Sequence, residues 1–247
     1  MRRAKLVQLL RQIKKNFSKP PRQPKRGRGK AKTFSDLSMV LCTVVMVAHK
    51  IREFQALHDF LNENPKLQKE CKLKVLPHRT TFSRRIKGVC EVVRTQIQHL
   101  GDLLIHQKAV SGKTAAVDKS LFRSVGPLWH KSYRQKGIIP DKLRNVDVES
   151  QWGYSPYHGW VQGYGLHAVC TADKDEPMVF LDAWVEPANV DETKVFPTHV
   201  PALSDSISRV LADTKYSGQA SIELVQRQQG GRITRRLVTP VEKAKST

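Results

Sequence analysis

Two short apolar runs that each end in an aspartate constrain the fold of this 247-residue chain more than any other feature. The first run begins at Thr114 and ends at Asp118, and the second begins at Arg209 and ends at Asp213. If the runs form neighbouring parallel strands, about 4.8 Å apart, both carboxylates face the crevice where open α/β sheets bind ligands. Two hard oxygen ligands there would suit Mg²⁺ or Mn²⁺. Aspartate at a strand end also commonly caps the following segment, so this alternative stays open.

The charge of the chain points to a polyanionic partner. Lys and Arg total 43 against 22 Asp and Glu, which gives a net charge of +21. Residues 1–32 contain 13 of these basic residues and no acid, so the rest of the chain carries only +8. A protein this basic is drawn to nucleic acid by counterion release, and double-stranded DNA is the first partner to expect. We therefore interpret residues 1–32 as a basic, largely disordered arm.

The arm itself has two parts. Apolar side chains at helical spacing among the basic residues predict a basic amphipathic helix: Leu6, Leu9, Leu10, Ile13 and Phe17. Such a helix also suits a membrane surface or an organellar transit peptide. Residues 19–30, rich in Pro, Gly and charge, predict a disordered linker that contacts phosphates without reading bases, although a merely solubilising tail remains an alternative.

Two features indicate an intracellular protein outside the membrane. The apolar stretch 39–48 is far shorter than the roughly 20 residues that span a bilayer, so we expect a buried helix there and no membrane partner. The four cysteines show no Cys-x-x-Cys spacing, which argues against a zinc site and a disulfide framework and fits a reducing cytosol.

Residues 33–108 predict a small helical domain. Apolar residues step by three and four along three helices, around 37–45, 54–61 and 82–104. Four basic residues lie at the start of the last helix: Arg79, Arg84, Arg85 and Lys87. A helix N-terminus with added cations favours phosphate contacts, so we expect DNA binding there, with a solvated polar face as the alternative.

From residue 113 the pattern changes to short strands. Strands are predicted at 114–117, 161–171 and 178–185, with a hairpin turn at 173–177. A connection over 191–208 has a helix in its second half, followed by a strand at 210–212, a helix at 216–228 and a strand at 233–238. This order is the start of a ribonuclease H-like mixed sheet with flanking helices, an α/β (α+β) fold that is incomplete at the C-terminus.

The chain resembles insertion-sequence DDE transposases from about Thr33 onward. Four segments carry the resemblance: 77–87, 116–120, 159–167 and 210–218. It implies a helical DNA-binding domain (33–108) and a partial ribonuclease H-like catalytic domain (113–247). Asp118 and Asp213 match the family's first two acids, and so would be both catalytic residues and ligands of two Mg²⁺ or Mn²⁺ ions.

The resemblance further implies metal-dependent cleavage and transfer of DNA strands in the movement of an insertion sequence. The partners would be transposon ends and target DNA, bound by a homodimer, in the cytoplasm of a bacterium at its nucleoid. The chain departs from the family at Lys119, where a small residue is usual, and at Gly165, where Lys is frequent. Residues 119–150 look like a loop crossing toward DNA, so Lys119 and Arg123 join the expected DNA contacts.

The third acid of the family is the largest departure. The family places it on a helix after the final strand. Here that strand ends near Val238, and the nine residues that follow it are too few for a helix with its own packing stripe. Glu242 is the only acid among them, and Glu223 belongs to the preceding helix. We therefore expect a truncated chain with weak or absent activity, an inactive remnant. The alternatives are a non-catalytic DNA-binding regulator of transposition and a basic RNA-associated or ribosome-associated protein.

Two further features are open to both a structural and a functional interpretation. His167, near the sheet centre, is expected to be a core histidine with its hydrogen bonds satisfied. Aromatic residues gather just before and within the second strand: Trp152, Tyr154, Tyr157, Trp160 and Tyr164. We expect them to pack an irregular insertion onto the sheet, while stacking on unpaired bases at a transposon end is the alternative.

Overall fold

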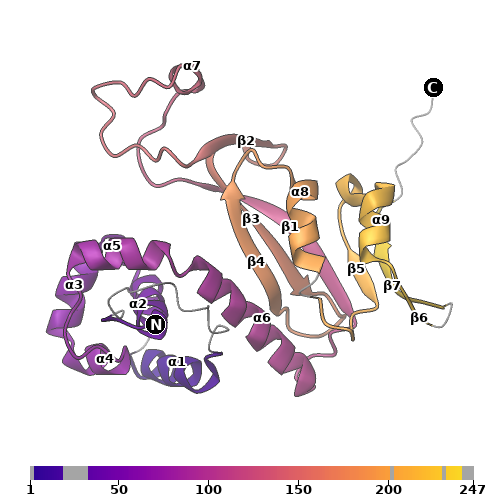
Figure 1. Cartoon of the computed structure of the whole chain (residues 1–247), viewed down its shortest axis with the longest axis horizontal. Coiled ribbons are helices and arrows are strands. Elements are labelled where there is room, and N and C mark those ends of the chain that lie inside the picture. Colours follow the sequence, from indigo (N-terminus) through magenta and orange to yellow (C-terminus); the bar gives the residue numbers. More distant parts are fainter. Residues whose placement is uncertain (1–2, 19–32, 201–202, 230–231, 241–247) are drawn as a thin grey trace, which may run out of the picture. The chain divides into compact units, whose positions relative to one another are not determined.

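The computed structural model describes residues 3–18, 33–200, 203–229 and 232–240, and its chain forms two compact units, 1–99 and 100–247. Helices come first, and the described residues of the second unit form a mixed sheet of seven strands with flanking helices (Figure 1). The predicted α/β fold class is therefore confirmed.

The first unit is built from helices around one hydrophobic core. Its helices are α1 (Arg3–Asn16), α2 (Asp36–His49), α3 (Phe54–Glu63), α4 (Pro65–Glu70), α5 (Arg79–Lys87) and the first part of α6 (Cys90–His106). Helix α2 begins where the Ser35 hydroxyl accepts a hydrogen bond from the Ser38 amide at 3.1 Å, which satisfies one of the free amides of the first turn. The core collects the apolar face of each helix, as the periodicity predicts.

Helix α1 belongs to this core. The predicted amphipathic helix is confirmed, and its Leu6 and Leu10 are fully buried. On its polar side Arg11 and Lys14 form ion pairs with Glu70 of α4. This part of the basic arm is thus an ordered helix with a covered apolar face, while the predicted linker at 19–30 lies outside the described residues.

The second unit contains the sheet. Its strands are β1 (Thr114–Arg123), β2 (Gln151–Ser155), β3 (Gly159–Thr171), β4 (Phe180–Pro187), β5 (Arg209–Leu211), β6 (Arg227–Gln229) and β7 (Arg232–Val238). The strand order is β2-β3-β1-β5-β7-β6, and β4 also pairs with β3. Strand β1 is antiparallel to β3 and parallel to β5, which is parallel to β7.

The order of most helices and strands along this unit agrees with the prediction from the sequence. Strands β1, β3 and β4 are followed by helix α8 (Glu192–His199), strand β5, the 3-10 helix η2 (Thr214–Tyr216), helix α9 (Gln219–Val225) and strand β7. That is the predicted order of three strands, helix, strand, helix and strand. Helix α9 is shorter than predicted because the chain turns into β6, which pairs with β7.

Three predictions about this unit are wrong. Strand β1 continues to Arg123, so Asp118 lies within the strand. The helix expected in the second half of 191–208 lies in the first half, because the Asp191 carboxylate caps it by accepting from the Thr193 amide at 2.8 Å. Strand β2 was missed because β3 begins earlier than predicted and offers a paired edge at Gly159–Gly163.

Strands β1 and β3 approach each other closely at Gly163. A Cβ at Gly163 would lie 1.8 Å from the Phe122 carbonyl oxygen, so only glycine fits between β1 and β3 there. The long segment between β1 and β2, which includes α7 (Lys131–Gln135), extends away from the sheet (Figure 1). All four cysteines are free thiols, and none of the described helices is long and apolar enough to cross a membrane.

Candidate functional site

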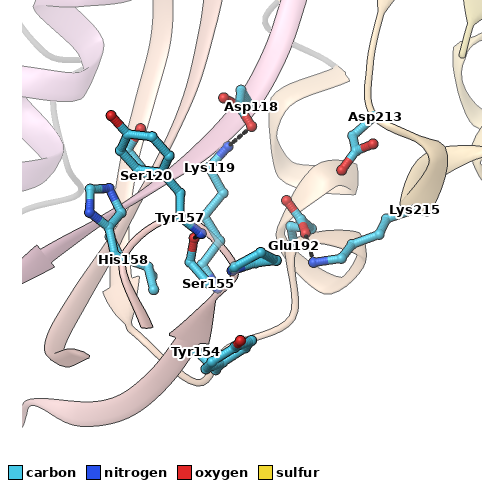
Figure 2. Close-up of a pocket in the computed structure, with 12 residues that line it drawn as sticks. Asp118, Lys119, Ser120, Tyr154, Ser155, Tyr157, His158, Glu192, Asp213 and Lys215 are labelled. Carbon is cyan, nitrogen blue, oxygen red and sulfur yellow. Dashed lines mark hydrogen bonds and ion pairs between the residues drawn. The ribbon is translucent and has the colours of Figure 1, made fainter. Parts of the chain in front are cut away.

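The pairing of β1 with β5 brings the two predicted aspartates level with each other. The strands run parallel, with Ala116 opposite Leu211 as the last pair. Asp118 lies two residues beyond this pair on β1, and Asp213 lies two residues beyond it, just past the end of β5. Both line one cavity of about 440 Å³, as Figure 2 shows. The central expectation from the sequence, that these distant acids converge, agrees with this arrangement.

Asp118 is held in the middle of a paired strand. It lies opposite Ala168 of β3, and strand alternation exposes it while Val117 is buried. Its Oδ1 accepts a hydrogen bond from the Lys119 amide at 2.7 Å. Its backbone position is therefore fixed by the sheet rather than by a strand terminus.

Asp213 lies on irregular chain just beyond β5. Its Oδ1 accepts hydrogen bonds from the Thr214 amide at 2.6 Å and the Thr214 hydroxyl at 3.2 Å, so it caps the 3-10 helix η2. The capping interpretation of this aspartate is thus correct as far as it goes. Capping and metal binding are compatible, because a carboxylate has two oxygens and about four lone-pair positions.

A third carboxylate in the same cavity was not predicted. Glu192 is the first residue of α8 and is only 7% exposed. It accepts hydrogen bonds from Lys215 Nζ at 2.7 Å and from the Tyr216 hydroxyl at 3.3 Å. In Figure 2 the Lys215 ammonium points at the Glu192 carboxylate, on the side of the cavity where Asp213 also lies. Glu192 thus lies at the start of α8, directly after the β4–α8 connection. In the chain it comes before strand β5 and Asp213.

The electrostatics of this trio follow from burial and close contact. The hydrogen bond to Glu192 raises the pKa of Lys215 above its ordinary value, so the lysine is held as the ammonium. Burial, together with the nearby Glu192 carboxylate, raises the pKa of the Tyr216 hydroxyl, which stays protonated and serves as a donor. Glu192 is therefore stabilised by two donors inside a wall of the cavity.

Lys119 lines the cavity, but its ammonium is already engaged. It donates to the carbonyl oxygens of Ala188 at 3.1 Å and Val190 at 2.6 Å. Burial lowers its pKa below the ordinary value for lysine. The side chain reaches these carbonyls over Gly165, where a Cβ would lie 2.6 Å from Lys119 Cε. The two departures from the family pattern, Lys119 and Gly165, are thus neighbours in space.

Carboxylate oxygens fit a hard divalent cation, and the cavity supplies two exposed ones on Asp118 and Asp213. No group of three or more His, Cys, Asp or Glu side chains within the described ranges is arranged to hold a metal ion. Glu192 is the third acid lining the cavity, and its carboxylate is occupied by Lys215 and Tyr216. The side chains present thus fit two ligands of an ion and would need a rearrangement to supply a third from Glu192.

A pair of buried histidines lies between β3 and α8. His167 and His199 are each 1% exposed, and their rings stack with centroids 6.5 Å apart. His199 Nδ1 lies 2.7 Å from Oδ2 of the buried Asp182. The Nε2 atoms of both rings have no hydrogen-bond partner among the described residues, so His167 is a core histidine as predicted, but its hydrogen bonds are not all satisfied. Burial, with Lys119 nearby, lowers the pKa of His167 to about 4.

The basic residues predicted to bind DNA fall into two groups. On α5, Arg79, Arg84 and Lys87 are exposed, whereas Arg85 forms an ion pair with Asp36 of α2 at 2.5 Å and fastens two helices together. Arg123 is exposed at the end of β1. Because α5 and β1 belong to different units, a common DNA path for the two groups stays a prediction.

Of the two other acids considered as third ligands, only Glu223 lies among the described residues. Glu223 is on α9 and accepts a hydrogen bond from Gln219 on the same helix at 2.8 Å, and it does not line the cavity. Glu242 lies outside the described residues.

The aromatic cluster divides into a packed half and an exposed half. Trp152 donates through Nε1 to the Trp129 carbonyl at 2.9 Å, and the Tyr164 hydroxyl donates to Asp147 at 2.8 Å, so these two pack as predicted. Tyr154, Tyr157 and Trp160 are instead 60%, 89% and 56% exposed. The packing interpretation is therefore wrong for these three side chains.

No protein-family model matches the chain, and no curated protein matches its sequence. Among solved structures, the chain is similar to a piggyBac transposase from a cryo-EM synaptic complex with hairpin DNA, with 14% sequence identity and a TM-score of 0.32. The match covers 69% of this chain and 34% of that one, so the chain spans about a third of that transposase.

Proposed function

We propose that this protein is a DNA-strand-cleaving and strand-transferring enzyme of the DDE transposase type. The observation that supports this most directly is that Asp118 of β1 and Asp213, two residues beyond the end of the adjacent parallel strand β5, line one cavity. In open sheets with parallel strands, ligands bind beyond the carboxyl ends of the strands. The cavity lies there for β5, and the net charge of +21 suits a nucleic-acid substrate.

In this proposal Asp118 and Asp213 would be the residues that hold divalent cations at the cavity. When bound, two such ions activate an oxygen nucleophile, neutralise the scissile phosphate and stabilise the leaving 3′ oxygen. Asp118 presents its carboxylate from a rigid strand, which fixes one side of the ion site. Double-stranded DNA at transposon ends and at a target site would be the substrate.

Glu192 is our candidate for the third carboxylate. It lines the cavity with both aspartates, and its oxygens are held by donors that a cation could replace. Lys215 would swing away toward solvent, since its side chain is already 65% exposed. The acid that the family places after its last strand would then be replaced here by one from the start of α8.

A plasmid-nicking assay with the purified full chain tests this function. In Mg²⁺ or Mn²⁺, supercoiled DNA should be nicked, and Asp118→Asn or Asp213→Asn should reduce the rate by about 100-fold or more, because losing a ligand costs several kcal/mol and each 1.36 kcal/mol is tenfold in rate. Asp175→Asn is the matched control, since Asp175 is exposed in a turn with φ 63°, a conformation that asparagine tolerates. Nicking that survives Asp118→Asn would overturn the assignment.

A non-catalytic DNA-binding regulator is the second candidate. It is favoured by the absence, within the described part of the chain, of three acids poised for one ion. In that case the wild type would not nick DNA, Mn²⁺ titration followed by electron paramagnetic resonance would detect no bound ion, and the double variant Asp118→Asn/Asp213→Asn would bind DNA as the wild type does. Metal uptake that the double variant loses would favour the enzyme instead.

A further inference from the structure

The turn that joins β2 to β3 carries exposed aromatic rings into the same cavity as the acids. Tyr154, Tyr157 and His158 line the cavity together with Asp118 and Asp213, and we call these three residues the hairpin tip. Figure 2 shows Tyr154 and His158 along the side of the cavity away from Asp213. Tyr157 is 89% exposed and Tyr154 is 60% exposed. Large aromatic side chains left uncovered in this way mark a binding surface.

The backbone fixes the hairpin tip rigidly behind these rings. Tyr154 pairs with Trp160 across the two strands, and their rings lie 5.4 Å apart in a tilted arrangement. Gly159 has φ 66°, which glycine adopts without strain and which makes the tight turn. The rings are therefore presented on a paired hairpin rather than on a loose loop, so little order would have to be imposed on binding.

The charges around the hairpin tip suit one kind of partner. Lys131 Nζ lies 5.1 Å from the centre of the Trp160 ring, which in turn contacts the Tyr154 ring. Lys119 and Lys215 add positive charge to the cavity lining, where Lys119 donates to two backbone carbonyls and Lys215 donates to Glu192. Aromatic faces next to cations bind single-stranded nucleic acid, because bases stack on the rings while phosphates meet the cations. An acidic peptide would be repelled by the carboxylates of Asp118 and Asp213, and an apolar peptide would leave them unpaired.

We propose that the hairpin tip stacks an unpaired nucleobase of the DNA strand whose phosphate lies at Asp118 and Asp213. This inference rests on the proposed function for the identity of the strand, and it adds a substrate feature: a base that is unstacked from the duplex next to the scissile phosphate. Tyr157 and Tyr154 provide the ring faces. Unstacking costs energy in a duplex and least where a base is already unpaired, so the site would select for an unpaired position.

Affinity for two matched DNA duplexes tests the proposal without any cleavage. Both duplexes are labelled for fluorescence anisotropy and titrated with the full chain in Ca²⁺, an oxygen-ligated divalent cation that takes the place of Mg²⁺ at the carboxylates. One duplex carries a single unpaired 2-aminopurine, and the other carries an abasic site at that position. The wild type should bind the first about tenfold more tightly, which is the size of one base–aromatic stacking interaction. Fluorescence of the 2-aminopurine should change on binding, as its ring meets tyrosine.

Three variants and one control assign the effect to the hairpin tip. Tyr157→Ala and Tyr154→Ala should each reduce the preference for the unpaired base toward onefold, while Tyr157→Phe should keep it because the ring face remains. Tyr133→Ala is the matched control, since Tyr133 is 46% exposed on α7 and does not line the cavity. The slope of log affinity against log salt should stay the same in all variants, because stacking releases no counterions.

The outcomes separate this proposal from the proposed function. Equal affinity of the wild type for both duplexes, or a loss of preference in Tyr133→Ala as large as in Tyr157→Ala, would overturn the stacking role. If nicking still requires Asp118 in that case, the enzyme stands and the hairpin tip has no base-binding role. The tyrosine rings are exposed, so the melting temperatures of the tyrosine variants should match that of the wild type. If Tyr157→Ala melts earlier, Tyr157→Ser takes its place in the same titration.

Discussion

Lys215 donates a hydrogen bond to Oε1 of Glu192 at 2.7 Å, and the pair forms part of the wall of the cavity that contains Asp118 and Asp213. Glu192 is buried, whereas the Lys215 side chain is 65% exposed. An ion pair with one exposed partner contributes little to stability, about 0 to 1 kcal/mol. Its larger effect is to occupy a carboxylate that a cation would otherwise bind.

Replacing Lys215 by methionine should therefore strengthen metal binding. The change frees Glu192 from its strongest donor while keeping the length of the side chain, so we expect Mn²⁺ affinity to rise by about tenfold, the equivalent of about 1.4 kcal/mol. Electron paramagnetic resonance titration measures this directly. Lys194→Met is the control, since Lys194 is an exposed lysine of α8 that does not line the cavity. Unchanged affinity in Lys215→Met would show that Glu192 is not a ligand.

Stability should fall as the pH drops below about 6.5, and His167 should be the cause. Burial lowers the pKa of His167 to about 4 in the folded protein, against about 6.5 in an unfolded chain. Between these values the unfolded chain takes up a proton that the folded chain refuses, so the free energy of unfolding should decrease by about 2 kcal/mol from pH 7.5 to pH 5.0. Urea denaturation at the two pH values measures it.

His167→Leu provides the check on that prediction. Leucine is apolar and cannot titrate, so the difference between the two pH values should shrink by about the same 2 kcal/mol. His158→Leu is the control, because His158 is exposed on the hairpin tip. An equal pH dependence in His167→Leu and the wild type would assign the effect to other groups.

Two glycines of β3 should respond differently to alanine. At Gly163 a Cβ would lie 1.8 Å from a backbone oxygen of β1, which cannot move without breaking strand pairs, so we expect a loss of about 3 kcal/mol. At Gly165 the nearest atom is Cε of Lys119, a flexible side chain that can shift, so we expect about 1 kcal/mol. Thermal unfolding compares the two variants, and a larger loss for Gly165→Ala would contradict the strand contacts described here.

Neighbouring arginines of α5 should also separate by function. Arg84 is exposed, so Arg84→Ala should weaken DNA binding for all sequences and reduce the salt slope by about 0.9 if that arginine contacts a phosphate. Arg85 is paired with Asp36 instead, so Arg85→Ala should lower stability by about 1 kcal/mol. Filter binding at several salt concentrations and urea denaturation distinguish the two. A reduced slope in Arg85→Ala alone would reverse the assignment.

The convergence of Asp118 and Asp213 was predictable because each acid directly follows an apolar run, and parallel strands place equivalent positions at one level. Glu192 was not, since a lone acid after a strand looks like a helix start. The signal that could have found it is Asp191 with Thr193 as a cap, followed by apolar residues at Val195 and Phe196. Pro197, which lies inside α8, is a residue that local rules exclude from a helix interior.

Other misses share one cause, that partners far away in sequence decide the outcome. Helix α1 carries so many basic residues that its apolar stripe suggested an outer arm, yet Leu6 and Leu10 are fully buried. Strand β2 exists because β3 offers it an edge, and its own five residues show little alternation. The exposure of Tyr157 likewise depends on where a turn projects, which no local pattern specifies.

The two aspartates differ in how firmly the fold holds them. Asp118 is fixed by strand pairing to Ala168, while Asp213 lies beyond the last residue of β5, at the start of a short 3-10 turn. A small displacement of that turn would change the spacing between the carboxylates without breaking any β1–β3 pair. One side of the site is thus held by strand pairing, and the other side is held only by a short turn. Movement of the turn alone would adjust the distance between the carboxylates to ions and substrates of different size.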